Sequence, residues 1–209
     1  MRSLNAFRIL LLAAWAGAVA SCSDSGSPPD DGGTSKPPSE LSVIHVAPSS
    51  TPLVSTTVSF YAKRGENSEG SLSFQGTGGG EGEEYVRLRI DANSLLALPN
   101  GDPIAPGDSV LITLSVVDPT EMLFDLQPTG LTFSPADPAE LKIHYDHADG
   151  DLNDDGVSDS RDTVIERMLA IWRQESLTDP FVRLTSVLTI ETDEATAELT
   201  GFSRYALAY

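Results

Sequence analysis

An aspartate-rich stretch at residues 149–162, DGDLNDDGVSDSRD, has the residue types and the spacing that suit a calcium ion. If Asp151 is position 1, side chains with oxygen donors stand at positions 3, 5, 9 and 12, and Gly156 stands at position 6. Calcium takes six to eight oxygen ligands, and a glycine at the sixth position permits the sharp bend that turns alternate residues inward. The spacing therefore predicts one calcium ion, bound by the side chains of Asp151, Asn153, Asp155, Asp159 and Asp162 and by the backbone carbonyl of Val157.

The pattern is of the EF-hand type, and it resembles the calcium loop of dockerins, D-x-N-x-D-G-x-x-D-x-x-D with a single following helix. Position 12 is Asp162 where an ordinary EF-hand has glutamate, and residues 141–150 before the loop are typical of a strand. Dockerins carry two such loops and bind cohesin through paired helices, whereas this chain has one loop. The resemblance therefore implies the metal but not that partner. At the affinities of about 10⁻⁴–10⁻³ M that are typical of extracellular modules, the ion would be structural.

The charge of the chain favours cations. It has 31 acidic and 13 basic residues and a formal net charge of −18 at pH 7, which makes nucleic-acid binding unexpected. A solvated acidic turn without an ion is the alternative for residues 149–162, because Asp, Asn and Gly are common in turns. We favour the ion, since chance seldom places oxygen donors at five such positions with a glycine at the sixth.

Helical periodicity occurs once, directly after the loop. Within residues 163–175, apolar side chains at i, i+3, i+4 and i+7 predict a helix with one apolar face: Ile165, Met168, Leu169 and Trp172. Asp162 would place a carboxylate at the positive end of this helix. Dockerin-type docking would require Met168 and Trp172 to be exposed. A sugar platform of Trp172 and Phe181 is a further alternative, but we expect Trp172 to pack against the rest of the domain.

The remainder of the chain predicts a mainly β protein. Val86, Leu88 and Ile90 alternate with polar residues, as in a half-solvated antiparallel strand. Similar short segments separated by Gly and Pro signals predict an antiparallel β-sandwich. The expected strands are residues 41–46, 54–65, 71–76, 85–92, 109–119, 122–130, 139–147, 181–191, 195–201 and 203–209, and the Gly-rich residues 76–84 should form a loop. One domain would span residues 41–209, with residues 146–176 as an inserted calcium loop plus α-helix.

Three segments carry a resemblance to a known domain: VRLRIDANSLLALPNG (86–101), GDSVLITLSVVDP (107–119) and LFDLQPTGLTFSPADPAELKIHY (123–145). They are similar to the β-sandwich domain shared by zonula occludens proteins, netrin receptors and ankyrins, which also occurs in bacterial envelope proteins. In that family the domain is an interaction or structural module. The resemblance therefore implies no catalytic residues.

The residues themselves give little support for an enzyme. The chain has neither a Gly-x-Ser-x-Gly nor an HExxH motif. His144 and His147 flank Tyr145 at the end of an expected strand, and we expect them in solvent and not in a zinc site. A carbohydrate-binding or carbohydrate-active envelope protein stays open as the alternative function.

The first 21 residues predict an export signal. Arg2 and Arg8 form a basic region, and residues 9–20 are apolar but too few to span a bilayer. Residues 19–22, Val-Ala-Ser-Cys, resemble the bacterial lipobox, which implies that Cys22, the only cysteine, carries a lipid. Residues 22–40 are rich in Ser, Pro, Gly and Asp and predict a flexible tether.

Together these features predict a lipoprotein of the bacterial cell envelope, anchored to a membrane by Cys22. The outer membrane or the cell surface is favoured over the inner membrane. We expect a non-catalytic binding or scaffolding module with a structural calcium site. Its partner would be a protein or a glycan.

Overall fold

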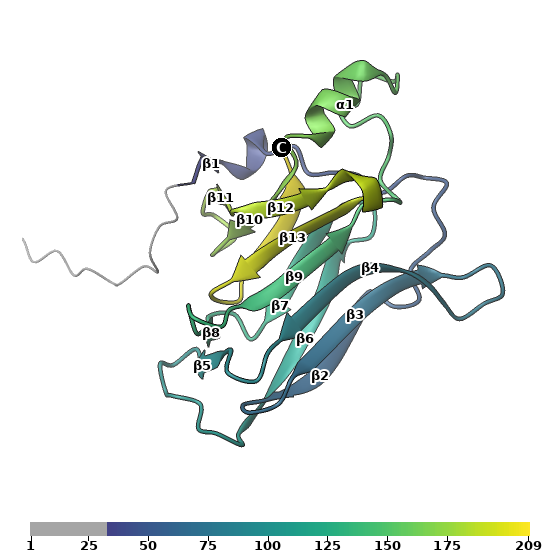
Figure 1. Cartoon of the computed structure of the whole chain (residues 1–209). Coiled ribbons are helices and arrows are strands. Elements are labelled where there is room, and N and C mark those ends of the chain that lie inside the picture. The colour runs from purple at the N-terminus through teal and green to yellow at the C-terminus, as the bar shows by residue number, and fades with distance from the viewer. Residues whose placement is uncertain (1–32) are drawn as a thin grey trace, which may run out of the picture. The chain divides into compact units, whose positions relative to one another are not determined.

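Two antiparallel sheets, packed face to face, make up most of the computed structural model, which describes residues 33–209 (Figure 1). The prediction of a mainly β, antiparallel sandwich with one α-helix is confirmed. The first sheet has seven strands in the order β1 (Ser35–Lys36), β11 (Phe181–Arg183), β10 (Ala170–Gln174), β14 (Arg204–Ala208), β7 (Leu123–Gln127), β6 (Ser109–Asp118) and β2 (Thr57–Lys63).

The second sheet has five strands, in the order β12 (Ser186–Thr189), β13 (Glu194–Leu199), β9 (Ala139–His144), β4 (Glu81–Ile90) and β3 (Ser68–Gln75). The short strands β5 (Leu95–Ala97) and β8 (Thr132–Phe133) pair with each other. The α-helix α1 covers Ser160–Glu166, and two 3₁₀ turns cover Pro38–Glu40 and Ile190–Thr192.

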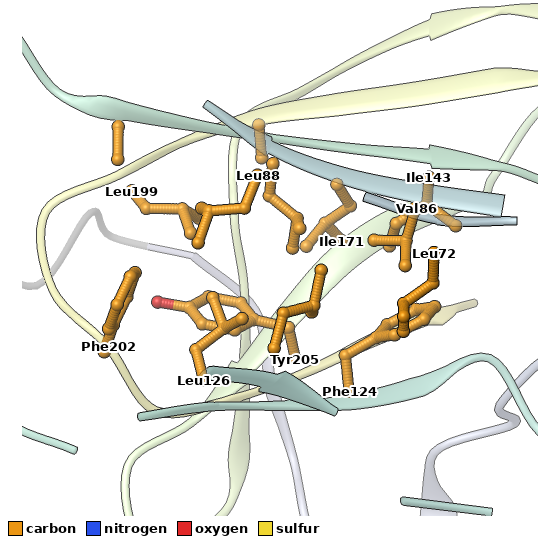
Figure 2. Packing of buried hydrophobic residues seen from close by; sticks show 14 of the residues in the cluster. Leu72, Val86, Leu88, Phe124, Leu126, Ile143, Ile171, Leu199, Phe202 and Tyr205 are labelled. Carbon is orange, nitrogen blue, oxygen red and sulfur yellow. The ribbon is translucent and has the colours of Figure 1, made fainter. Parts of the chain in front are cut away.

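The core lies between the inner faces of the two sheets (Figure 2). Val86, Leu88 and Ile90 of β4 are at most 1 % exposed, as the alternation in the sequence predicts. From the opposite sheet, Phe124 and Leu126 of β7 face them and are fully buried. The period of two along each strand therefore fills one continuous core from both sides.

The C-terminal strand β14 lies in the middle of the seven-stranded sheet. It pairs with β10 on one side and with β7 on the other. Leu207 is fully buried, and its backbone N–H donates to the carbonyl of Met122 at 3.0 Å. The last strand of the chain is thus a central part of the fold.

The predicted helix over residues 163–175 is wrong beyond Glu166. Residues 170–174 form β10, which pairs with β11 and β14. Leu169 and Ile171 pack into the main core, whereas Ala170 and Trp172 pack into a smaller cluster on the other face of the sheet. A strand that is buried on both faces has a continuous apolar run, and such a run also matches a helical stripe.

The N-terminal boundaries also differ from those predicted. The sheet begins at Ser35, inside the predicted tether, because β1 pairs with Phe181 and Val182. Residues 41–46 do not form a regular strand and make only isolated bridges, such as that between Val43 and Ala208. Cys22 and the predicted signal segment lie outside the described residues.

The Gly-rich hairpin is shorter than predicted. Residues 81–84 belong to β4 and pair with β3, so the loop between the two strands is confined to residues 76–80. Within residues 33–209, no helix has the length and apolar character that crossing a membrane requires.

Candidate metal centre

The aspartate loop and α1 connect the two sheets. They follow β9 of the five-stranded sheet and lead into β10 of the seven-stranded sheet (Figure 1). Leu152 packs against the core, and its carbonyl accepts a hydrogen bond from the Tyr209 hydroxyl at 3.0 Å. The loop is therefore fixed to the sandwich and also to the residue that follows the last strand.

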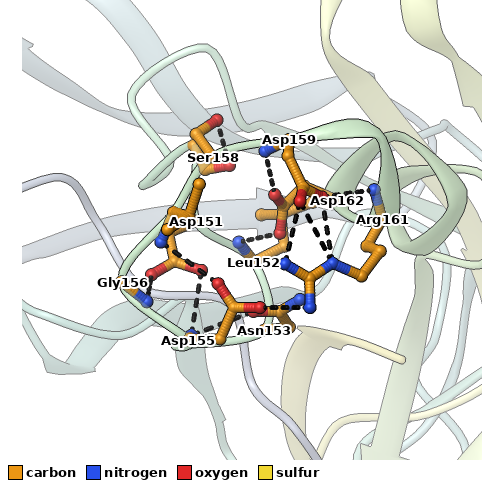
Figure 3. A network of polar contacts seen from close by, with 11 residues as sticks. Asp151, Leu152, Asn153, Asp155, Gly156, Ser158, Asp159, Arg161 and Asp162 are labelled. Carbon is orange, nitrogen blue, oxygen red and sulfur yellow. Dashed lines mark hydrogen bonds and ion pairs between the residues drawn. The ribbon is translucent and has the colours of Figure 1, made fainter.

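The first half of the loop is organised by side chains that accept hydrogen bonds from backbone amides (Figure 3). The Asp151 carboxylate accepts from the amides of Asp155 at 3.1 Å and Gly156 at 2.6 Å. Asn153 Oδ1 also accepts from the Asp155 amide, at 2.9 Å, and Asp155 Oδ1 accepts from the amide of Val157 at 3.1 Å. The side chains at positions 1, 3 and 5 thus turn toward the same short segment of backbone.

The bend itself requires left-handed backbone. Asp154 has a φ of 56° and Gly156 a φ of 86°. Aspartate is one of the few side chains that tolerate this region, and glycine enters it without a steric penalty. The glycine at position 6 therefore has the conformational role that the sequence assigned to it.

Asp162 connects the end of the loop to its beginning. Its side chain is 4 % exposed, and its two oxygens accept from the amides of Leu152 at 2.9 Å and Asp159 at 2.6 Å. Asp159 is the N-cap of α1, and together the two aspartates form a capping box. The twelfth position is thus occupied by a buried carboxylate whose oxygens organise the backbone on both sides.

Arg161 supplies a positive charge inside this group of carboxylates (Figure 3). Its guanidinium contacts Asp155 Oδ2 at 2.7 Å and Asp159 Oδ2 at 2.8 Å. The side-chain and backbone hydrogen bonds from Arg161 hold the pKa of Asp159 below its usual value. Asp159 is therefore ionised at neutral pH and paired with an arginine.

The donor set suits calcium, because every predicted ligand offers oxygen. The side-chain donors come from Asp151, Asn153, Asp155, Asp159 and Asp162, and Val157, whose side chain is 55 % exposed, would contribute only its carbonyl. The bend and the buried twelfth residue fit the predicted loop. However, the guanidinium of Arg161 contacts two of these carboxylates.

A second group of possible metal ligands lies outside the aspartate loop. The ligand atoms of Glu83, Asp146 and His147 all lie within 4.8 Å of one another, and this is the one such set found among residues 33–209. The spacing of the residues does not indicate this group, because the sequence predicts a loop for residues 76–84, which include Glu83. Burial raises the pKa of Asp146, as does the Glu83 carboxylate, while His147 lowers it.

The two histidines expected in solvent lie against carboxylates. His144 Nε2 is 3.2 Å from Glu84 Oε1, and His147 Nε2 is 2.9 Å from Glu83 Oε2. Their side chains are only 19 % and 16 % exposed, so the expectation of solvent exposure is wrong. They do not share a site, because each has its own carboxylate partner.

The surfaces that the alternative partners would require do not form, and Trp172 packs against the rest of the domain as expected. Trp172 and Phe181 are 2 % and 5 % exposed, so they make no aromatic platform. The indole N–H of Trp172 donates to the Ala208 carbonyl at 3.1 Å. Met168 is 46 % exposed but does not share a helix face with Trp172.

Comparison with known proteins gave no match to a family model, a curated protein or a solved structure. The resemblances to dockerins and to the sandwich domain of ankyrins stay predictions from sequence motifs.

Proposed function

We propose that this protein is a lipoprotein anchored to a membrane of the bacterial cell envelope. Its sandwich acts as a non-catalytic binding or scaffolding module, and one calcium ion in residues 151–162 has a structural role. The observation that carries the calcium assignment is the loop frame, in which a buried carboxylate at position 12 is hydrogen-bonded back to position 2. The lipobox-like residues 19–22 support the anchor.

The ion would supply positive charge where the chain concentrates negative charge. Asp151, Asp155, Asp159 and Asp162 are the carboxylates that would hold it, with Asn153 and the carbonyl of Val157 completing the oxygen ligands. Carboxylates that lie close together repel one another, and a divalent cation bound between them replaces this repulsion with attraction. In a chain with a net charge of −18, this local neutralisation favours the folded state.

The position of the loop supports a structural role for the ion. Residues 151–162 lie on the connection between the two sheets, and the loop is bonded to Tyr209 beyond the central strand β14. An ion there would hold the crossover, α1 and the C-terminus together. Binding to the folded state alone raises stability in proportion to the logarithm of the free calcium concentration above Kd.

Calcium titration by calorimetry on the full chain tests the calcium assignment, with thermal unfolding in calcium and in chelator beside it. We expect one ion per chain and a lower unfolding temperature in chelator. Asp151→Asn should abolish the heat, because it removes a ligand charge at position 1. Asp154→Asn makes the same chemical change at a left-handed, non-ligand position and should bind calcium normally. Equal heats for both variants, or no heat with the natural chain, would contradict the assignment.

A further inference from the structure

The side chains of Glu83, Asp146 and His147 converge where β4 begins and β9 ends, outside the aspartate loop. His147 Nε2 lies 2.9 Å from Glu83 Oε2 and 3.9 Å from Asp146 Oδ2. All three ligand atoms are within 4.8 Å of one another. Two carboxylate oxygens and one imidazole nitrogen thus lie close enough together to contact the same ion.

The fold brings these residues together through strand pairing. β4 and β9 are antiparallel, with Val86 opposite Ile143. Glu83 lies on β4 three residues before this pair, and Asp146 and His147 lie in the turn just beyond the end of β9. The cluster therefore joins β4 to the turn that follows β9.

Both the ring and the backbone of His147 are held in place. Its ring stacks on Phe74 of β3, with centroids 3.8 Å apart and planes 19° apart, and Phe74 is itself buried. Its backbone carbonyl accepts hydrogen bonds from the amide of Ala47 at 2.8 Å and from the Ser50 hydroxyl at 3.1 Å. The histidine ring is thus oriented by packing and cannot turn away freely from the carboxylates.

The distances match a metal site of ordinary size. Zinc binds imidazole nitrogen and carboxylate oxygen at about 2.0–2.2 Å, which places two ligands of a tetrahedral site about 3.4 Å apart. The observed separations of 2.9 and 3.9 Å lie on either side of that value. Imidazole nitrogen also distinguishes this cluster from the all-oxygen loop, because nitrogen favours zinc and related transition metals over calcium.

We propose that Glu83, Asp146 and His147 bind a divalent transition-metal ion of the zinc type, separate from the calcium loop. The ion takes one nitrogen and two oxygens from the protein, with solvent completing the shell. It ties the start of β4 to the segment that leads from β9 into the loop. The side chain of Glu83 is 72 % exposed, so the site is open to solvent.

Calorimetric titration with zinc tests this site. The full chain is used without a histidine tag and is first saturated with calcium. We expect one zinc ion per chain with a Kd in the micromolar range. His147→Gln and Glu83→Gln should each weaken binding by more than about tenfold, because even outer-shell partners contribute 10–100-fold in metal affinity. Glu83→Gln changes an exposed side chain, so its folding is readily checked by circular dichroism.

His144→Gln is the matched control. His144 is on the same segment and also contacts a glutamate, Glu84, at 3.2 Å, but its second neighbour, Glu194, is already paired with Lys142 at 3.1 Å. This variant should bind zinc like the natural chain. Zinc binding that survives both His147→Gln and Glu83→Gln, or that is lost in Asp151→Asn, would overturn the proposal, as would no binding by the natural chain. Because Asp151→Asn tests calcium independently, failure of the zinc site leaves the calcium assignment untouched.

Discussion

Arg161 contributes the full positive charge nearest to the predicted calcium ligands. It bridges Asp155 and Asp159, and its guanidinium thereby partly offsets the repulsion within the loop. The same contacts make Arg161 a competitor of the metal ion. An Asp155 Oδ2 atom that contacts the guanidinium is less available to coordinate calcium. At the scale of single residues, this arginine is therefore the feature that should tune calcium affinity.

Replacing Arg161 with glutamine should tighten calcium binding by roughly two- to thirtyfold, because it removes two exposed ion pairs of about 0.2–1 kcal/mol each. The same variant should unfold at a lower temperature than the natural chain in chelator, because its carboxylates lose their internal counter-ion. Calorimetry and thermal unfolding measure the two effects. Weaker calcium binding in the variant would mean that Arg161 supports the bound state and does not compete with it. Arg183→Gln, which removes an arginine outside the loop, serves as control.

At the scale of elements, β14 decides whether the seven-stranded sheet is continuous. It lies between β10 and β7, and all four residues from Tyr205 to Ala208 are fully buried. Both β10 and β7 therefore depend on β14, the last strand in the sequence, for hydrogen bonds along one edge. A cavity in this strand should weaken the whole sheet.

Leu207→Ala should lower the free energy of unfolding by about 2–5 kcal/mol, the usual cost of a leucine-to-alanine change in a core. Leu177→Ala makes the same change at a side chain that is 69 % exposed, and its effect should stay within about 0.5 kcal/mol. Denaturant unfolding of both variants measures the difference. Similar losses for both would contradict the central position of β14.

At the scale of the whole molecule, the proposed function depends on a single attachment point. Cys22 is the only cysteine, so one substitution removes every thiol that could carry a lipid. Several acyl chains hold a protein on a membrane much more firmly than one, at about 0.8 kcal/mol per buried methylene. The location of the protein should therefore depend on this residue alone.

Cys22→Ser should move the protein from the membrane fraction to the soluble fraction when the chain is expressed in a bacterium that processes lipoproteins. Mass spectrometry of the natural chain should show a lipidated N-terminal cysteine. Asp151→Asn, which alters the loop but not the cysteine, should stay in the membrane fraction. A Cys22→Ser protein that remains with the membrane would show that something other than the lipid anchors it.

The spacing of residue types along the sequence was enough to predict those features whose residues lie close together in the chain. The alternation of Val86, Leu88 and Ile90 predicted a strand with one buried face, since a period of two places every second side chain on the same side. The loop frame was also readable, because Gly156 and the inward-facing Asp151 lie within one short turn. Neither feature needs a distant partner to define it.

Only the tertiary structure decided the state of residues whose partners are distant. Residues 170–174 match a helical stripe equally well, but pairing with β14 and burial on both faces make them a strand, with Trp172 in a second apolar cluster. Glu83 meets Asp146 and His147 only because β4 pairs with β9, whose end leads into the turn that holds both residues. The physical reason is that sheet hydrogen bonds join segments far apart in the chain. A one-residue change of register would turn every side chain of a strand to the other face.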